Sequence, residues 1–126
     1  RIHWLGDLNE EEKAQRMLDA DVFCVPSLGG ESFANVLLEA AFLGVPSVST
    51  RVGAAVDLLE EGDLVAPGDS AGTSRRILDR LARPEWTRRL AAATRQRAFE
   101  RFTADHSTAQ WFALYDQLLS DKGEGQ

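Results

Sequence analysis

The sequence has a single cysteine, Cys24, and no run of about 20 apolar residues, the length a membrane-spanning helix needs. One cysteine cannot form an internal disulfide. Because Cys24 lies in the apolar segment 22–25, we expect a small buried side chain rather than a reactive thiol. The sequence also lacks an initiator methionine and a secretory signal, and it begins inside an apolar segment. We therefore expect a cytoplasmic chain that is part of a larger protein.

The composition is that of one folded domain. The chain has 126 residues, 44% hydrophobic and 27% charged, which allows one core and argues against disorder. Its net charge of −6 is unevenly distributed, because residues 75–101 contain nine arginines and only three acids. Such a segment can contact an anionic surface, but the simpler interpretation is a solvated helix face. We expect no nucleic-acid partner, and at most a peripheral membrane contact in the full-length protein.

Strands and helices alternate in the hydrophobic pattern. Period and turn residues predict strands at residues 2–5, 22–25, 45–50 and 64–66, with helices at 9–20, 33–43 and 55–60 between them. Gly44 is placed to cap the second of these helices, and Pro46 prevents its continuation. Fully apolar strands separated by helices indicate a parallel sheet covered on both faces. The predicted fold class is α/β, with a Rossmann-like doubly wound sheet.

The second half of the chain is predicted to be helical. One helix surrounds residues 77–81, another begins at Pro84, a position that helices accept, and a third covers 104–119 with Thr103 as its cap. Residues 121–126 are expected to form a flexible tail. The domain therefore occupies residues 1–120.

The loop at residues 26–32 is the most distinctive candidate for a ligand site. It reads Pro-Ser-Leu-Gly-Gly-Glu-Ser, follows a predicted strand and leads directly into the helix at 33–43. In doubly wound sheets, ligands bind beyond the carboxyl ends of the strands. The free N–H groups and positive dipole of a helix start suit a phosphate. Any strand, loop and helix in this order provides as much, so the loop alone is a weak signal.

Two carboxylates make the signal sharper. Glu31 lies just before the helix, and Glu39 lies about one and a half turns into it, leaning back toward the helix start. A carboxylate accepts two hydrogen bonds, which suits a vicinal diol. A diphosphate at the helix start with a diol-bearing sugar on either side, as in a nucleoside diphosphate sugar, matches both residues. The alternative is an exposed helix residue and a helix-start acid favoured by the dipole, and spacing alone favours this alternative.

Residues 20–50 closely resemble the signature of family 4 glycosyltransferases. The shared features are an aspartate-led strand ending in Pro-Ser, a Leu-Leu-Glu-Ala helix, a Gly-x-Pro turn, and the E-x7-E motif formed by Glu31 and Glu39. Similar residues also occur at 52–53, 65–69, 101–103 and Tyr115, so the resemblance covers nearly the whole chain. It implies the C-terminal, donor-binding domain of the type B glycosyltransferase fold.

The resemblance also implies a function for the site. Glu31 is the expected catalytic residue and contacts hydroxyls of the donor sugar, while Glu39 contacts the ribose. Backbone N–H groups near Phe33, Ala34 and Asn35 hold the diphosphate, and the loop at 6–9 lies near the base. Family members transfer the sugar with retention and generally without a metal, so donor groups stabilise the leaving diphosphate. No cofactor is expected, and His3 and His106 are expected to be structural.

This sequence departs from the family pattern in two places. The usual Gly-Phe-Gly is replaced by Ser32-Phe33-Ala34, and the second glycine of a Gly-Gly pair is replaced by Ala54. Ser32 is an acceptable helix cap, but the methyl group of Ala34 is expected to crowd a phosphate held against that backbone.

The resemblance also predicts missing parts. With the family strand order 3-2-1-4-5-6, residues 2–5 correspond to strand 3 and 22–25 to strand 4, and the two central strands and the N-terminal Rossmann-like domain are expected elsewhere in the same protein. We therefore predict that the isolated chain has no transferase activity and folds marginally, because the strand at 22–25 has an unpaired edge.

Two other functions stay open at this point. One is a nucleotide-sugar epimerase of related fold, which would need acid–base residues in place of Glu31. The other is a non-catalytic nucleotide-sugar-binding or assembly module.

Overall fold

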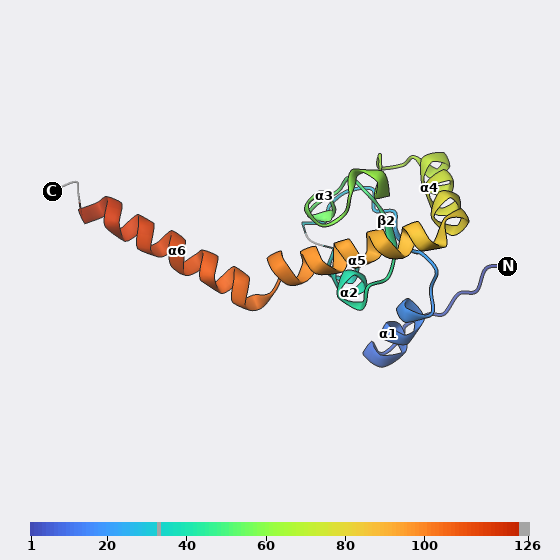
Figure 1. Cartoon of the computed structure of the whole chain (residues 1–126), viewed down its shortest axis with the longest axis horizontal. Helices are drawn as coiled ribbons and strands as arrows, with labels where there is room; N and C mark the ends of the chain where they lie inside the picture. The colour runs from blue at the N-terminus through green and yellow to red at the C-terminus, as the bar shows by residue number, and fades with distance from the viewer. Residues whose placement is uncertain (33, 124–126) are drawn as a thin grey trace.

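The computed structural model describes residues 1–32 and 34–123 and shows an α/β fold (Figure 1). Its sheet has three parallel strands in the order β1-β2-β3: β1 (Phe23–Val25), β2 (Ser47–Thr50) and β3 (Leu64–Val65). The helices are α1 (Glu10–Leu18), α2 (Asn35–Leu43), α3 (Ala55–Leu58), α4 (Ser70–Ala82), α5 (Pro84–Arg101) and α6 (Ala104–Gly123), with a 3-10 turn, η1 (Glu61–Asp63), before β3. The predicted fold class is confirmed.

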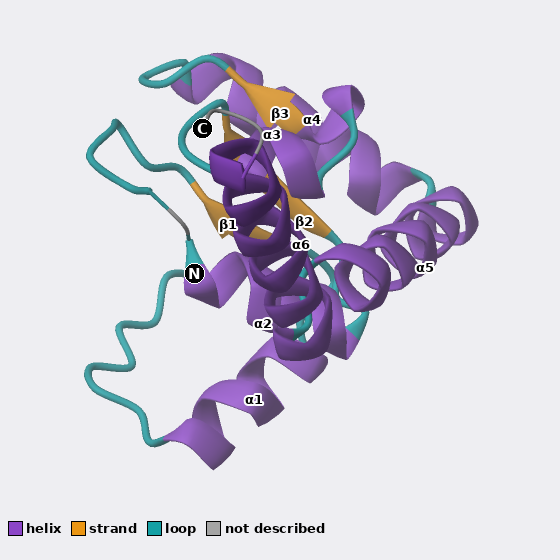
Figure 2. Ribbon diagram, turned by 90° about the vertical axis from the view of Figure 1, so that its left-hand side faces the viewer, coloured by secondary structure: helices purple, strands orange, loops and turns teal. Residues whose placement is uncertain are grey.

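The core forms where helices cover the middle strand (Figure 2). All four residues of β2 are buried, and Val48 is completely inaccessible. Leu37 of α2, Leu58 of α3 and Ala98 of α5 belong to one buried cluster beside the sheet. Because α2 packs against both the sheet and α5, its start is fixed at the end of β1 where the loop at 26–32 emerges.

Two helix ends follow the sequence prediction. Gly44 adopts a left-handed conformation with φ of 73° and donates its N–H to the Ala40 and Ala41 carbonyls, which ends α2. Thr103 Oγ1 accepts the His106 N–H at 3.3 Å at the start of α6. Both caps are confirmed.

The predicted strand at residues 2–5 is wrong for this structure. These residues form no regular element, and the side chains of Ile2 and Trp4 are 97% and 95% exposed. A strand needs a neighbour that accepts and donates its backbone hydrogen bonds. Within the part of the chain that the structure describes, β1 pairs only with β2, so residues 2–5 have no strand beside them.

Cys24 lies in β1 and is half-buried rather than fully buried. Burial raises the pKa of its thiol, which disfavours the reactive thiolate. The expectation of an unreactive packing residue is thus supported, although the side chain keeps some exposure.

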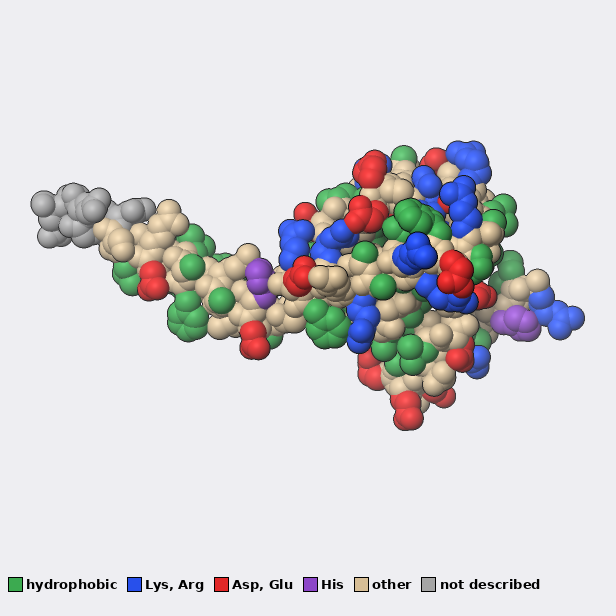
Figure 3. All heavy atoms as spheres, viewed as in Figure 1, with side chains coloured by type: hydrophobic (Ala, Val, Ile, Leu, Met, Phe, Trp, Pro, Cys, Tyr) green, Lys and Arg blue, Asp and Glu red, His purple; other side chains and the backbone are tan. Residues whose placement is uncertain are grey.

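Helix α6 extends away from the rest of the molecule, with apolar side chains along it (Figure 3). Its large exposed side chains are Trp111, Phe112, Leu114, Tyr115, Leu118 and Leu119. The helix reaches Gly123, so it includes the first three residues of the predicted tail, and residues 124–126 lie outside the described residues. The domain boundary at residue 120 stays a prediction. None of the helices in the described ranges has the length and apolar character to cross a bilayer.

Arg80 shows that the arginine-rich segment is not simply a solvated face. Arg80 is only 5% exposed, and its Nε donates to Asp63 Oδ1 at 2.6 Å while its Nη2 donates to the Gly62 carbonyl at 2.9 Å. Burial raises the pKa of the Asp63 carboxyl, and the hydrogen bond and charge of Arg80 act in the opposite direction. The pair joins η1 to α4, so the prediction of a solvated face is wrong for this residue.

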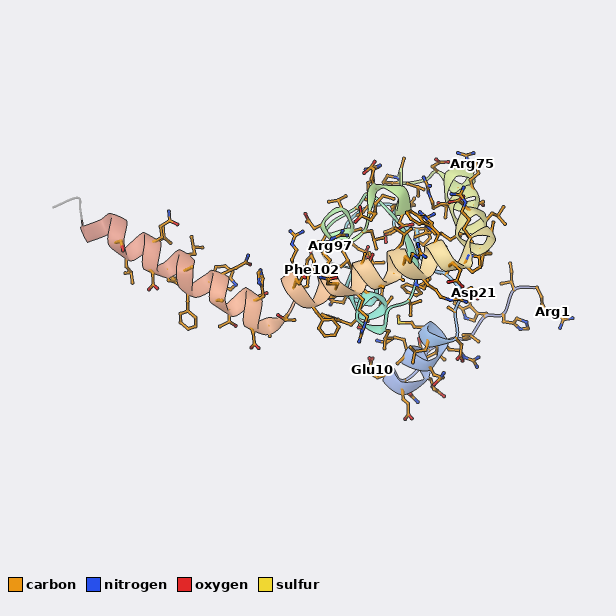
Figure 4. All side chains as sticks on the ribbon, viewed as in Figure 1. Arg1, Glu10, Asp21, Arg75, Arg97 and Phe102 are labelled. Atoms are coloured by element: carbon orange, nitrogen blue, oxygen red, sulfur yellow. The ribbon has the colours of Figure 1, made fainter. Side chains whose placement is uncertain are left out.

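Two arginines of α5 bind the ends of other helices. Arg95 Nε donates to the Phe42 carbonyl at 2.8 Å, near the end of α2. Arg97 of α5, labelled in Figure 4, donates from Nη1 to the Leu58 carbonyl at 2.7 Å, at the end of α3. A cation at a helix C-terminus is favoured by the dipole and satisfies a carbonyl that has no partner inside the helix. These arginines therefore fix α5 across the α/β core.

Candidate functional site

The predicted ligand loop lies at the carboxyl ends of β1 and β2. Ser27 Oγ donates a hydrogen bond to Glu31 Oε2 at 2.7 Å. The Ser27 carbonyl in turn accepts a hydrogen bond at 2.6 Å from Thr50 Oγ1, at the buried end of β2. Glu31 itself is exposed. The sheet thus holds the Glu31 side chain through Ser27, and the carboxylate keeps oxygen lone pairs available for a ligand.

Gly53 supports the same loop from behind. It has a φ of 53°, and a Cβ at this position would lie 2.6 Å from the Glu31 carbonyl oxygen and 2.8 Å from that of Ser32. The next residue, Ala54, donates its N–H to the Ser32 carbonyl at 3.2 Å. Only glycine combines this backbone conformation with so close an approach. The turn after β2 therefore sets the position of the Glu31 backbone.

The positive end of the α2 dipole is not neutralised by side chains of the helix start. Ala34 is buried and occupies the N-cap position without a side-chain hydrogen bond, and the first turn contains no acid. Asn35, the first helical residue, is exposed, and Phe33 lies outside the described residues. The expectation that Ser32 caps the helix is wrong, because the N-cap is two residues later and the Ser32 carbonyl is bound by Ala54. The positive end of this helix dipole is open to an anion.

Glu39 has different neighbours from Glu31. Its carboxylate is half-buried, and Oε2 lies 2.8 Å from Lys13 Nζ on α1. Lys13 also pairs with Glu10 at 2.7 Å, and the hydrogen bonds that the lysine donates to Glu10 and Glu39 raise its pKa. A cavity of about 270 Å³ between α1 and α2 is lined by Lys13, Glu39 and apolar residues including Phe42.

The structure therefore does not bring the two glutamates into one cavity. Glu31 lies in the loop and Glu39 lies against α1. The Lys13–Glu39 pair could not be predicted from the sequence, in which Lys13 is recognisable only as a lysine about one turn after an acid. The partner is on another helix, and only tertiary packing places it there.

A second cavity, of about 430 Å³, opens at the carboxyl ends of the strands. Pro26 and Leu28 line it on one side, Thr50 lies at its base, and the turn and first residues of α4 from Gly68 complete it. Sequence reasoning missed this contribution of α4. The lining beside the Glu31 loop is largely apolar, and the position is where doubly wound folds bind ligands.

The other predicted positions have local roles. Asn9, in the loop expected near a base, caps α1: its side chain accepts the Glu12 N–H while the Glu12 side chain accepts the Asn9 N–H. His3 is exposed. Among residues 1–32 and 34–123, no three or more His, Cys, Asp or Glu side chains are grouped closely enough to hold a metal.

The fold is that of part of a type B glycosyltransferase, and comparison with known proteins agrees. The chain matches a solved sucrose-phosphate synthase from Thermosynechococcus elongatus with a TM-score of 0.81 and 30% identity, covering 96% of this chain and 31% of that one. Residues 1–83 match the family described as glycosyl transferases group 1. The chain belongs to this family.

Two curated relatives extend the match over the whole chain. A phosphatidyl-myo-inositol mannosyltransferase from Mycobacterium leprae is 32% identical over 99% of this chain and 34% of its own length. An N-acetyl-alpha-D-glucosaminyl L-malate synthase from Bacillus anthracis is 32% identical over 100% of this chain and 33% of its own length. The chain thus spans about a third of the length of the relatives it matches.

Proposed function

We propose that this chain is the nucleotide-sugar-binding part of a retaining glycosyltransferase, which transfers the sugar from a nucleoside diphosphate to an acceptor. Family membership supports the transfer chemistry. The observation that carries the assignment to this site is the start of α2, which is uncapped and free of acids beside a carboxylate held by Ser27. Neither the epimerase nor the non-catalytic alternative has an observation in its favour.

In this proposal, each part of the donor contacts one part of the site. Backbone N–H groups near Phe33, Ala34 and Asn35 bind the diphosphate, and Glu31 accepts hydrogen bonds from hydroxyls of the sugar. As the glycosidic bond to the diphosphate breaks, negative charge grows on the leaving oxygen. The positive end of α2 stabilises that charge without a metal ion.

Glu39 binds the ribose diol in the same proposal. Its carboxylate pairs with Lys13 in the structure, so the lysine limits its rotation. An oriented carboxylate can accept hydrogen bonds from both hydroxyl groups of a diol. Lys13 is thus a positioning residue for Glu39.

The partners complete the proposal. A second, N-terminal Rossmann-like domain of the same protein supplies the acceptor site, and the 126-residue chain alone does not turn over a nucleotide sugar. A cytoplasmic location, where free thiols such as Cys24 stay reduced, and a peripheral membrane contact of the full-length protein belong to the same proposal.

The test separates the two glutamates by the ligands they are proposed to touch. In the full-length protein, calorimetry gives the affinity for a nucleoside diphosphate and for the corresponding nucleotide sugar, with UDP, GDP and ADP forms compared. Glu39→Ala is expected to lower the affinity for both ligands by about tenfold to a hundredfold, which corresponds to the loss of a charged hydrogen bond. Glu31→Ala is expected to lower only the affinity for the nucleotide sugar to that extent.

Glu11→Ala on α1 is the control, because it removes an exposed acid that no proposed contact uses. An unchanged nucleoside diphosphate affinity in Glu39→Ala refutes the ribose assignment. Equal weakening of both ligands in Glu31→Ala refutes the sugar assignment.

A further inference from the structure

Three arginines of α4 and α5 make no hydrogen bond or ion pair with the residues that the structure describes. Of the nine arginines in residues 75–101, six make hydrogen bonds or ion pairs: Arg80, Arg83, Arg88, Arg95, Arg97 and Arg101. Within residues 1–32 and 34–123, Arg75, Arg76 and Arg89 make neither, although the charge of Arg76 acts on Asp63 from a distance. The fold therefore uses most of this positive charge internally and leaves two adjacent arginines on α4.

Arg75 and Arg76 both line a cavity of about 510 Å³ between β3 and one face of α4. Arg51, just after β2, lines it as well, together with Asp69 and Asp79 of the α4 side. Figure 3 shows Lys and Arg side chains gathered over the end of the molecule where α4 lies, and Figure 4 places Arg75 on that helix. The volume is within the range of small-molecule sites, roughly 300–1,000 Å³.

The carboxylates of this cavity already have partners. Asp69 Oδ1 accepts the Gly72 N–H at 2.7 Å and caps α4. Asp79 pairs with Arg80 at 2.8 Å and with Arg83 at 2.6 Å.

The third arginine of the cavity is also engaged, because Arg51 pairs with Glu61. The uncompensated charge in the cavity is therefore that of Arg75 and Arg76. None of the lining residues belongs to the segment 26–39.

We propose that the cavity between β3 and α4 binds a phosphate-bearing small molecule, with the guanidinium groups of Arg75 and Arg76 as donors to its phosphate. Planar guanidinium groups match phosphate oxygens in pairs, and each is always charged. Asp69 and Asp79 on the same wall would repel an anionic bilayer pressed against it. The second carboxylate oxygen of Asp69, whose Oδ1 is bound by the Gly72 N–H, can accept a hydroxyl group of a small ligand instead.

The experiment titrates the full-length protein with inorganic pyrophosphate at low ionic strength, where charge is least screened. The Asn35→Asp background is used, because it places an acid at the other anion site, the α2 start. Binding is expected, and Arg75→Ala and Arg76→Ala are each expected to weaken it at least tenfold. Arg89→Ala, which removes an equally unpaired arginine outside the cavity, is expected to change it less than twofold. Circular dichroism of each variant shows that it has kept its fold.

Three results overturn the proposal. The first is no pyrophosphate binding to the folded chain. The second is equal weakening by Arg89→Ala, which indicates unspecific attraction. The third is binding to phosphatidylserine vesicles that depends on Arg75 and Arg76 and that pyrophosphate does not compete away, which assigns the surface to a membrane. Because no nucleotide sugar is used, failure here does not affect the proposed transferase function.

Discussion

Helices α1 and α2 each have nine residues, and their starts are built in opposite ways. The start of α1 is closed by a capping box between Asn9 and Glu12, with three acids in its first turn. The start of α2 has an alanine at the N-cap, no side-chain hydrogen bond and no acid. Capping and first-turn acids each stabilise a helix, so α2 forgoes about 1–2 kcal/mol that α1 obtains.

The two helix starts differ in whether the chain itself or a ligand satisfies the free N–H groups. At α1 the N–H groups and the dipole are satisfied by the chain itself. At α2 they are left to a ligand, and stability comes from elsewhere: Leu37 is buried in the core and Arg95 binds a carbonyl near the other end of the helix. A helix start that serves a diphosphate cannot also be filled by a side chain.

The largest expected loss of stability is for substitution of Gly53, which supports the loop leading to α2. Gly53→Ala forces a Cβ against the Glu31 and Ser32 carbonyls in a left-handed backbone, at a cost of about 2–4 kcal/mol. Thermal unfolding followed by circular dichroism measures the loss. The affinity of the full-length protein for a nucleotide sugar is expected to fall as well, because the Glu31 backbone is displaced.

Gly68→Ala is the matched control. Gly68 has a φ of 80°, but a Cβ there would meet no atom within 4 Å, so only the backbone strain of about 1 kcal/mol remains. If the two variants melt at the same temperature, the close approach of Gly53 to the Glu31 loop has no energetic importance.

A smaller effect is expected at the α1 start. Asn9→Ala removes one half of the capping box and should lower the free energy of unfolding by about 1 kcal/mol in a urea titration. Affinity for inorganic pyrophosphate should stay the same, because the proposal assigns this helix start no contact with the diphosphate. A loss of pyrophosphate binding larger than twofold would make α1, and not only α2, part of the phosphate site.

The smallest expected effect is on the pH dependence of stability. It arises from Lys13, which joins α1 to Glu39 of α2. The hydrogen bonds that Lys13 donates to Glu10 and Glu39 raise its pKa above 10.5 in the folded state. Its stabilising contribution is therefore complete below pH 10.5 and is lost as the pH rises through the folded-state pKa. The melting temperatures of the wild type and Lys13→Met should converge over that range. A constant gap at all pH values contradicts the ion pair.

The sequence predicted most of the fold because its elements are specified locally. Period and turn residues located the strands β1 to β3 and the helices around them, and Gly44 and Thr103 are caps whose partners lie within a few residues. The segment 2–5 shows the limit of that information. Its apolar pattern is that of a strand, but a strand exists only beside a partner, and the pattern says nothing about the partner.

The candidate site, too, could be predicted from the sequence only where it depends on local order along the chain. The loop that presents Glu31 follows from the strand, turn and helix order, whereas the contacts that orient the carboxylates do not. Thr50 to Ser27 and Lys13 to Glu39 join segments that only packing brings together. The same holds for Arg80, whose burial against Asp63 could not be distinguished from solvation in an arginine-rich sequence.

The most direct test of the account is Asn35→Asp, which gives the exposed first residue of α2 the acid that α1 has. Calorimetric titration with a nucleoside diphosphate and thermal unfolding are measured on the same full-length protein. Stability and affinity are expected to change in opposite directions. Stability rises by about 0.3–1 kcal/mol because the acid interacts favourably with the helix dipole, and nucleoside diphosphate affinity falls about tenfold because the acid repels the diphosphate. Unchanged affinity in a stabilised variant would contradict the claim that the open start of α2 holds the diphosphate.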